Sequence, residues 1–125
     1  MTNITCGIVG CGFVGGALKR WLEEHNPFAK ILILDPYKGY EDDVSVADVI
    51  FVSIHIPTEQ DGTQDLTILK QIINKLPINK PIFIRTTILP GTSNMLSKET
   101  KRSVYFMPEF LTQKGRLMRI FALSL

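Results

Sequence analysis

Three glycines stand in the segment Gly10-Cys11-Gly12-Phe13-Val14-Gly15, directly after an apolar run typical of a buried strand and directly before a run with helical spacing. In that context the spacing Gly-x-Gly-x-x-Gly is typical of a turn that binds the diphosphate of a dinucleotide. We expect Gly10 to permit the tight turn, Gly12 to let the backbone approach the phosphates, and Gly15 to let the helix pack closely on the strand. The alternative is a strand-to-helix turn that binds nothing.

The start of the following helix is expected to contribute to the same site. A helix N-terminus presents free N–H groups and a partial positive charge, which places Phe13 and Val14 among the candidate cofactor-binding residues. Gly16 follows the third glycine of the pattern and is expected to allow still closer packing of the helix.

An acid closes the second predicted strand. Asp35 stands twenty residues after Gly15, where a carboxylate can accept hydrogen bonds from the hydroxyls of an adenosine ribose. An acid at this place also repels a 2′-phosphate, so it favours NAD over NADP, although Lys38 nearby would soften that preference. The alternative is that Asp35 and the proline after it simply begin a turn.

Two further loops carry polar residues at the ends of predicted strands. His55-Ile56-Pro57-Thr58 follows the third strand, and the segment from Thr86-Thr87 to Pro90-Gly91-Thr92 follows the fourth. Ligands of open parallel sheets lie beyond the carboxyl ends of the strands, so these loops face the same crevice as the glycine turn. Their hydroxyls and amides are candidates to line a cofactor, although an ordinary strand-ending turn would use similar residues. His55 is a candidate base, with a hydrogen-bonded structural histidine as the alternative.

The hydrophobic pattern indicates the elements that position these residues. Apolar residues with helical spacing predict one helix over Val14–Leu22 and another over Leu66–Leu76, with Asp65 as the N-cap of the second. Only about 13 residues, rich in turn formers and acids, separate Asp35 from the third strand, so a turn or a short helix is expected there. The predicted strands are Ile4–Val9, Lys30–Leu34, Val49–Ile54, Pro81–Arg85 and Val104–Phe106.

Strands that alternate with helices predict an α/β fold, here a Rossmann-type doubly wound parallel sheet of about five or six strands in three α/β/α layers. The third strand is apolar without alternation, which predicts a central strand covered on both faces. The length of 125 residues fits one domain, so we expect an NAD-binding domain over residues 1–111 and a C-terminal tail over residues 112–125.

Composition and charge exclude several classes of partner. Hydrophobic residues make up 45% and charged residues 21% of the chain, as in folded proteins. The net charge of +2 comes from scattered residues, so no basic stripe indicates nucleic acid or an anionic membrane. No apolar run approaches the roughly 20 residues of a membrane span, and no signal pattern is visible, so a cytoplasmic location is expected.

The cysteines, Cys6 and Cys11, fall on the first strand and in the turn after it. Side chains so placed are poorly positioned for a disulfide, and no companion histidine supports a metal site. We interpret both as buried thiols and expect no bound metal.

Four segments together resemble the N-terminal domain of the UDP-glucose/GDP-mannose dehydrogenase family, in order and approximate spacing over residues 4–111. Asp61-Gly62 followed by Asp65 also resembles the loop found in many members. The four segments are Gly10–Gly15, Asp48–Ser53 leading to Pro57-Thr58, Thr86-Thr87 through Pro90-Gly91-Thr92, and Pro108-Glu109-Phe110-Leu111.

This resemblance implies an activity and roles for particular residues. The family oxidises the primary alcohol of a nucleotide sugar to a carboxylate, passing two hydrides to two NAD molecules through a thioester on a cysteine. The resemblance implies that Thr58 and Thr87 lie beside the cofactor, with Thr87 also close to the reacting sugar carbon. It further implies that Glu109 is an acid at the mouth of the active site, suited to proton handling or to orienting a water. A solvated loop acid is the alternative for Glu109.

The chain also departs from the family pattern. Gln113 stands where the family usually has a second glutamate, and an amide cannot act as a base. The family's long dimer-forming helix, sugar-nucleotide domain and nucleophilic cysteine would all come after position 125, and neither Cys6 nor Cys11 is placed to substitute. We therefore expect a UDP-glucose 6-dehydrogenase-like domain that binds NAD but oxidises a UDP-sugar only when a second domain is supplied. A truncated product, a shifted reading frame or an isolated domain would each explain such an ending.

The residues leave three alternative functions open. A stand-alone nucleotide-binding regulatory module would use the same fold without catalysis and would self-associate through the apolar residues 116–125. A methyltransferase also uses a glycine-rich first turn and an acid after the second strand, although the three glycines have dinucleotide spacing. The last alternative is a remnant without activity.

Overall fold

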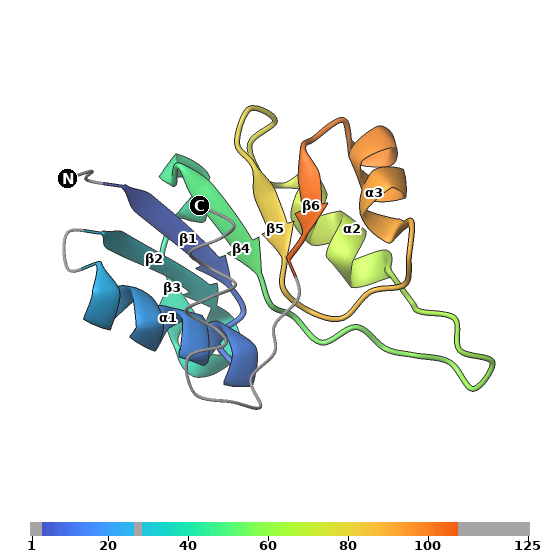
Figure 1. Cartoon of the computed structure of the whole chain (residues 1–125), viewed down its shortest axis with the longest axis horizontal. Coiled ribbons are helices and arrows are strands. Elements are labelled where there is room, and N and C mark those ends of the chain that lie inside the picture. The colour runs from blue at the N-terminus through green and yellow to red at the C-terminus, as the bar shows by residue number, and fades with distance from the viewer. Residues whose placement is uncertain (1–3, 27–28, 108–125) are drawn as a thin grey trace.

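A six-stranded sheet forms the centre of the chain in a computed structural model that describes residues 4–26 and 29–107. The strand order is β3-β2-β1-β4-β5-β6, and every pair is parallel except β2 with β3 (Figure 1). The strands are β1 (Thr5–Val9), β2 (Lys30–Asp35), β3 (Tyr40–Glu41), β4 (Val49–Val52), β5 (Ile82–Ile84) and β6 (Val104–Phe106). The helices are α1 (Phe13–His25), α2 (Thr67–Asn74) and α3 (Thr92–Thr100), with short 3₁₀ turns η1 (Pro36–Lys38) and η2 (Val44–Val46).

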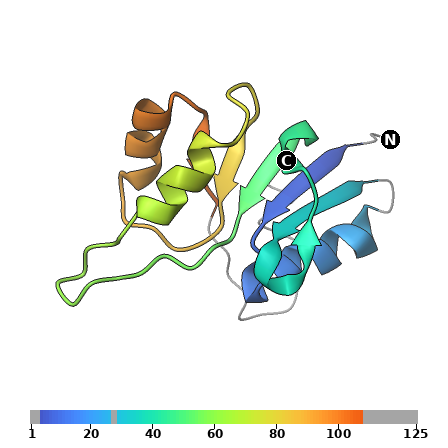
Figure 2. The same ribbon diagram turned by 180° about the vertical axis from the view of Figure 1, so that it is seen from behind.

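Side chains alternate between the two faces of the sheet, and each face has its own hydrophobic cluster. On one face Cys6 and Ile8 pack with Leu18 and Leu22 of α1. On the other, strand residues such as Ile50 pack with α2, α3 and η2. Figure 1 shows α1 in front of β1 and β2, and Figure 2 shows α2 on the opposite side of the sheet. The predicted three-layer Rossmann-type fold is therefore confirmed.

All the predicted strands are present, and the largest difference is that β4 ends at Val52 rather than at Ile54. All four residues of β4 are buried, which confirms the prediction of a central strand. The expectation of a turn or short helix after Asp35 is also confirmed, because η1, the two-residue strand β3 and η2 fill that segment. The β2–β4 connection is therefore short and carries no full crossover helix.

The prediction that Asp65 is the N-cap of α2 was wrong. Leu66 holds the N-cap position, while the Asp65 carboxylate accepts a hydrogen bond of 3.0 Å from the amide of Thr67. The carboxylate thus forms a tight turn to the residue two positions on, and the helix begins after that turn.

Arg102 closes the ends of two helices. Its guanidinium donates to the carbonyl oxygens of Asn74, the last residue of α2, and of Leu76 just beyond it, each at 2.9 Å, and to that of Thr100 in α3 at 2.6 Å. The last carbonyls of a helix have no partner within the helix, so these bonds satisfy groups that would otherwise need water. One side chain therefore fixes the ends of α2 and α3 relative to each other.

Two further expectations concern membrane-spanning helices and the boundary between the domain and its tail. In the portion of the chain that the structure describes, no helix has both the length and the apolarity to cross a bilayer. The division into a domain over residues 1–111 and a tail over residues 112–125 stays a prediction, because positions 108–125 lie outside the described residues.

Candidate functional site

The three glycines of the turn differ in what a side chain would meet. Gly10 has φ +89°, and an added Cβ would stand 2.7 Å from the carbonyl oxygen of Ser53. At Gly15 an added Cβ would collide with the carbonyl oxygen of Gly10. At Gly12 no atom of residues 4–26 or 29–107 lies within 4 Å of that position. The first and third glycines are thus required by the turn and by the approach of α1 to β1, whereas the space beside Gly12 is open for a ligand.

The first turn of α1 faces the same open space without a side-chain cap. Gly12 is the N-cap residue and has no side chain, so it makes no side-chain cap bond to the first amides of the helix. The backbone of Phe13 and Val14 forms the first two positions of α1. Gly16 was expected to allow still closer packing of the helix, but an added Cβ there would make only an ordinary contact, 3.6 Å from Nη1 of Arg20, so this position does not require glycine.

Asp35 ends β2 beside the glycine turn. Its Oδ2 accepts a hydrogen bond of 2.8 Å from the amide of Cys11, and the amide of Gly10 donates to the carbonyl of Leu34 at 3.0 Å. The end of β2 therefore holds the turn in place, a role that the sequence did not indicate. Asp35 also precedes η1, so it stands at the start of a turn as well as beside the glycines. Lys38 is exposed in η1.

A pocket of about 790 Å³ opens at the carboxyl ends of β1, β2 and β4. This volume is within the usual range for small-molecule and cofactor sites. The glycine turn and Asp35 line one end of the pocket, and apolar residues of α2 line one wall. The lining residues are Val9, Gly10, Gly12, Leu34, Asp35, Pro36, Tyr37, Asp42, Asp43, Val44, Ser45, Ser53, Ile54, His55, Ile68, Ile72, Lys75 and Leu76.

Carboxylates gather on the η1–η2 side of this pocket. Oδ2 of Asp42 accepts from the amide of Ile33 at 2.9 Å. The Ser45 hydroxyl and amide donate to Asp43, and these hydrogen bonds lower the pKa of the Asp43 carboxyl. Together with Asp35 these acids give one side of the pocket a negative potential, which favours hydroxyl donors over a further phosphate at that side.

Ser53 lies beneath the glycine turn and lines the pocket. Its amide donates to the carbonyl of Val9 at 2.8 Å, whereas its Oγ is buried and has no hydrogen-bond partner among the described residues. A buried hydroxyl without a partner is destabilising, which makes Ser53 a candidate for a contact completed by a ligand. Neither the spacing nor the residue type singled it out.

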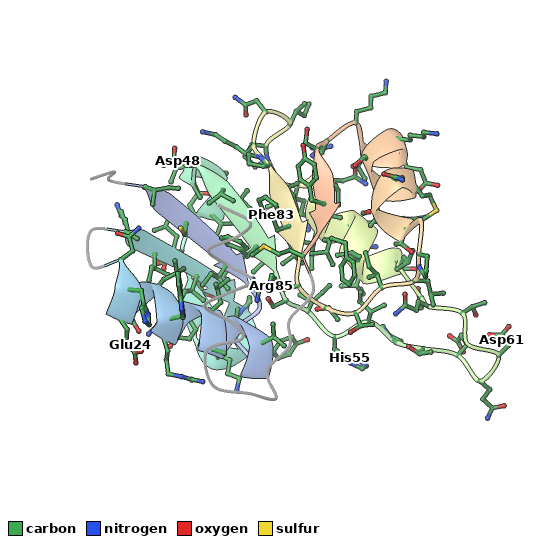
Figure 3. All side chains as sticks on the ribbon, viewed as in Figure 1. Glu24, Asp48, His55, Asp61, Phe83 and Arg85 are labelled. Atoms are coloured by element: carbon green, nitrogen blue, oxygen red, sulfur yellow. The ribbon has the colours of Figure 1, made fainter. Side chains whose placement is uncertain are left out.

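The threonines of the two later loops do not line the pocket. Thr58 and Thr87 are both exposed, Thr58 on the hairpin after β4 and Thr87 on the loop after β5. His55 is exposed and does line the pocket, and Figure 3 shows it at the root of the projecting segment that ends near Asp61. Glu109 and Gln113 lie outside the described residues.

A buried arginine occupies the carboxyl end of β5. Arg85 is 2% exposed, and burial lowers the pKa of its guanidinium to about 10. It therefore stays protonated at neutral pH and places a positive charge close to the loop that carries Thr87. Its position near the middle of the molecule is visible in Figure 3.

The thiols differ in their surroundings. Cys6 is buried, and this burial, with a smaller effect of the charge of Asp48, raises the pKa of its thiol to about 11. Cys11 is only half-buried in the glycine turn, so the expectation of two buried thiols holds for Cys6 alone. Both are free. Over positions 4–26 and 29–107 no group of three metal-binding side chains is assembled.

A mostly parallel, doubly wound sheet with a glycine turn at the end of its first strand defines this chain as a Rossmann-like α/β domain. No family model matches the chain, and neither does any curated protein. Among solved structures it is similar to a GDP-mannose dehydrogenase from Pseudomonas aeruginosa, solved as a ternary complex, with a TM-score of 0.62 and 16% sequence identity. The match covers 90% of this chain and 38% of that one, so the chain spans well under half the length of that structure.

Proposed function

We propose that this chain binds NAD as the cofactor domain of a nucleotide-sugar dehydrogenase. The observation that carries the proposal is the open space beside Gly12, at the uncapped start of α1 and at one end of a pocket of about 790 Å³. Backbone amides that face such a space suit a diphosphate, because they donate hydrogen bonds and carry the positive end of the helix dipole. The similarity to a GDP-mannose dehydrogenase supports the same class.

Each part of the dinucleotide has suitable partners in this chain. The diphosphate would bind at Gly12, Phe13 and Val14, and the adenosine ribose would donate its hydroxyls to Asp35. The apolar wall from α2, with Ile68 and Ile72, offers a surface for the adenine. When bound, NAD would supply the hydride acceptor for oxidation of an alcohol.

The acids on the η1–η2 side support NAD rather than NADP. A 2′-phosphate on the adenosine ribose would stand near Asp35, Asp42 and Asp43, which all line the pocket. Lys38 does not line it, so we propose that this lysine only weakly offsets the preference.

Oxidation of a nucleotide sugar, with UDP-glucose as the proposed substrate, would need more than these residues. A thioester route needs a reactive cysteine, whereas Cys6 is buried with a raised pKa and Cys11 belongs to the glycine turn. Thr58 and Thr87 are the proposed contacts on the nicotinamide and sugar side, and Glu109 is the proposed acid of the completed site. We therefore expect cofactor binding by this chain and sugar oxidation only with a second domain.

Calorimetric titration tests the proposal directly. NAD and NADH are expected to bind, NADP to bind more weakly, and S-adenosylmethionine not to compete. Asp35→Asn keeps an acceptor for the Cys11 amide but removes the negative charge. It should therefore weaken NAD binding about tenfold and reduce the preference for NAD over NADP. Absence of binding by either NAD or NADH at millimolar concentration would refute the proposal. Steady NADH production from UDP-glucose by this chain alone would contradict the requirement for a second domain.

A further inference from the structure

The segment after β4 forms a well-paired hairpin that projects from the sheet (Figures 1 and 2). The amide of Asp65 donates to the carbonyl of Pro57 at 2.8 Å, and Thr58 pairs with Gln64 in an antiparallel bridge. At the tip, the Asp61 carboxylate accepts from the amide and the hydroxyl of one threonine. The hairpin is therefore held by its own hydrogen bonds as one unit.

The side chain of Gln64 joins this hairpin to the loop between β5 and α3. Its Nε2 donates to the carbonyl of Thr87 at 3.0 Å, and its Oε1 accepts from the amide of Leu89 at 3.1 Å. A primary amide can make both bonds at once because it carries donors and an acceptor, whereas a carboxylate lacks the donor and an ammonium lacks the acceptor. Gln64 thereby fixes the backbone of Thr87 relative to the hairpin that carries Thr58.

The strand order gives this contact its place in the proposed cofactor site. The adenosine half of a dinucleotide belongs at β1 and β2, where the glycine turn and Asp35 line the pocket. The other half of a dinucleotide that spans such a sheet continues across the strands on the far side of β1, which here are β4 and β5. The loops after β4 and β5 are the two that Gln64 connects.

We propose that Gln64 is a positioning residue that holds these two loops, with Thr58 and Thr87, around the nicotinamide half of the bound dinucleotide. This inference rests on the proposed function. A free loop would have to be ordered when the ligand binds, and that ordering would weaken affinity. The contact between Gln64 and the β5–α3 loop orders this loop before the ligand binds, and the loop is proposed to contact only the nicotinamide half. The adenosine half should bind independently of Gln64.

The test compares NAD with ADP, which contains only the adenosine and diphosphate part. Gln64→Met keeps the approximate length of the side chain but removes both hydrogen bonds, and Gln64→Glu keeps only the acceptor. Gln60→Met, at an exposed position on the same hairpin, is the matched control. We expect Gln64→Met to weaken NAD binding about tenfold while ADP binding changes less than about twofold. Gln64→Glu should weaken NAD binding as much as Gln64→Met does, or less. Gln60→Met should leave the affinities for NAD and ADP unchanged.

A second readout needs no ligand. Hydrogen exchange at the amide of Leu89 should become faster in Gln64→Met than in the parent chain and stay unchanged in Gln60→Met. Unchanged exchange would show that the bond to Leu89 is not made in solution and would overturn the inference.

The binding outcomes separate this inference from the proposed function. If the parent chain binds neither NAD nor ADP, the proposed function fails and the inference fails with it. If it binds ADP but gains nothing from the nicotinamide half, the adenosine site stands and the role of Gln64 is overturned. If Gln64→Met weakens the binding of ADP and NAD equally, or changes the binding of neither, the role of Gln64 is also overturned.

Discussion

The glycine turn allows stability and binding to be separated by single added methyl groups. At Gly15 the new Cβ would press against the carbonyl group of Gly10, and backbone atoms at the α1–β1 contact have little freedom to move. Overpacking of this kind costs about 1–3 kcal/mol, and contact with backbone places Gly15→Ala near the upper end. A loss of about 3 kcal/mol is a large part of the roughly 5–15 kcal/mol by which domains are stable.

Gly12→Ala should behave in the opposite way. No described residue lies within 4 Å of the added Cβ, and φ is −80°, outside the left-handed range that favours glycine. The loss of a good N-cap residue should cost at most about 1 kcal/mol. The methyl group would nevertheless occupy the space where a diphosphate must approach the backbone. Loss of one charge-assisted hydrogen bond, about 1.5–3 kcal/mol, corresponds to a Kd raised roughly 10- to 150-fold.

Gly16→Ala provides the matched control within the same helix. Its Cβ would make only an ordinary contact, so the gain in helix propensity should raise the free energy of unfolding by up to about 1 kcal/mol. NAD binding should be unchanged. Urea unfolding measures the three stabilities, and calorimetry measures the three affinities. If Gly12→Ala binds NAD as tightly as the parent chain, the space beside Gly12 is not the diphosphate site.

Three further predictions concern other parts of the fold. Ser53→Ala removes a buried hydroxyl that has no partner among the described residues, so urea unfolding should show an unchanged stability or a gain of up to about 1 kcal/mol. A clear loss of stability would show that this hydroxyl has a partner in solution. Arg102→Met removes hydrogen bonds to carbonyls at the ends of α2 and α3 and should lower the free energy of unfolding by about 3 kcal/mol, whereas Lys98→Met, at an exposed position, should leave it unchanged. Burial raises the pKa of the Cys6 thiol from 9.0 to about 11, so the folded state holds this proton more tightly. The associated stability is therefore complete below pH 9 and declines as the pH rises towards 11, a decline that Cys6→Ala should reduce in urea titrations at each pH.

The strands and the glycine turn could be predicted because their signals are local. β4 is an uninterrupted apolar run, and α1 shows helical spacing directly after the glycines. Helix α3 went unpredicted because Leu96 is its only large apolar residue that is fully buried, while its other buried positions are the threonines Thr92 and Thr100. Such a helix has too weak an apolar stripe to be recognised from spacing.

Contacts between distant segments could not be predicted from the sequence. The bond from Cys11 to Asp35 spans 24 residues, and the bonds of Gln64 span 23 and 25 residues. Glutamine has no positional preference that would single out Gln64, and the resemblance to known enzymes drew attention to its threonine neighbours instead. The burial of the Ser53 hydroxyl, which has no partner in the described part of the chain, likewise depends on packing beneath the turn.

The order of the strands has a consequence for synthesis on the ribosome. β1 lies between β2 and β4, so this part of the sheet can pair once residue 52 has left the exit tunnel. Helix α2 is complete by residue 74, but the side chain that closes its end belongs to Arg102. We therefore expect the end of α2 to stay frayed while β5 and α3 are translated, and this half of the domain to become resistant to proteases only after Arg102 has emerged.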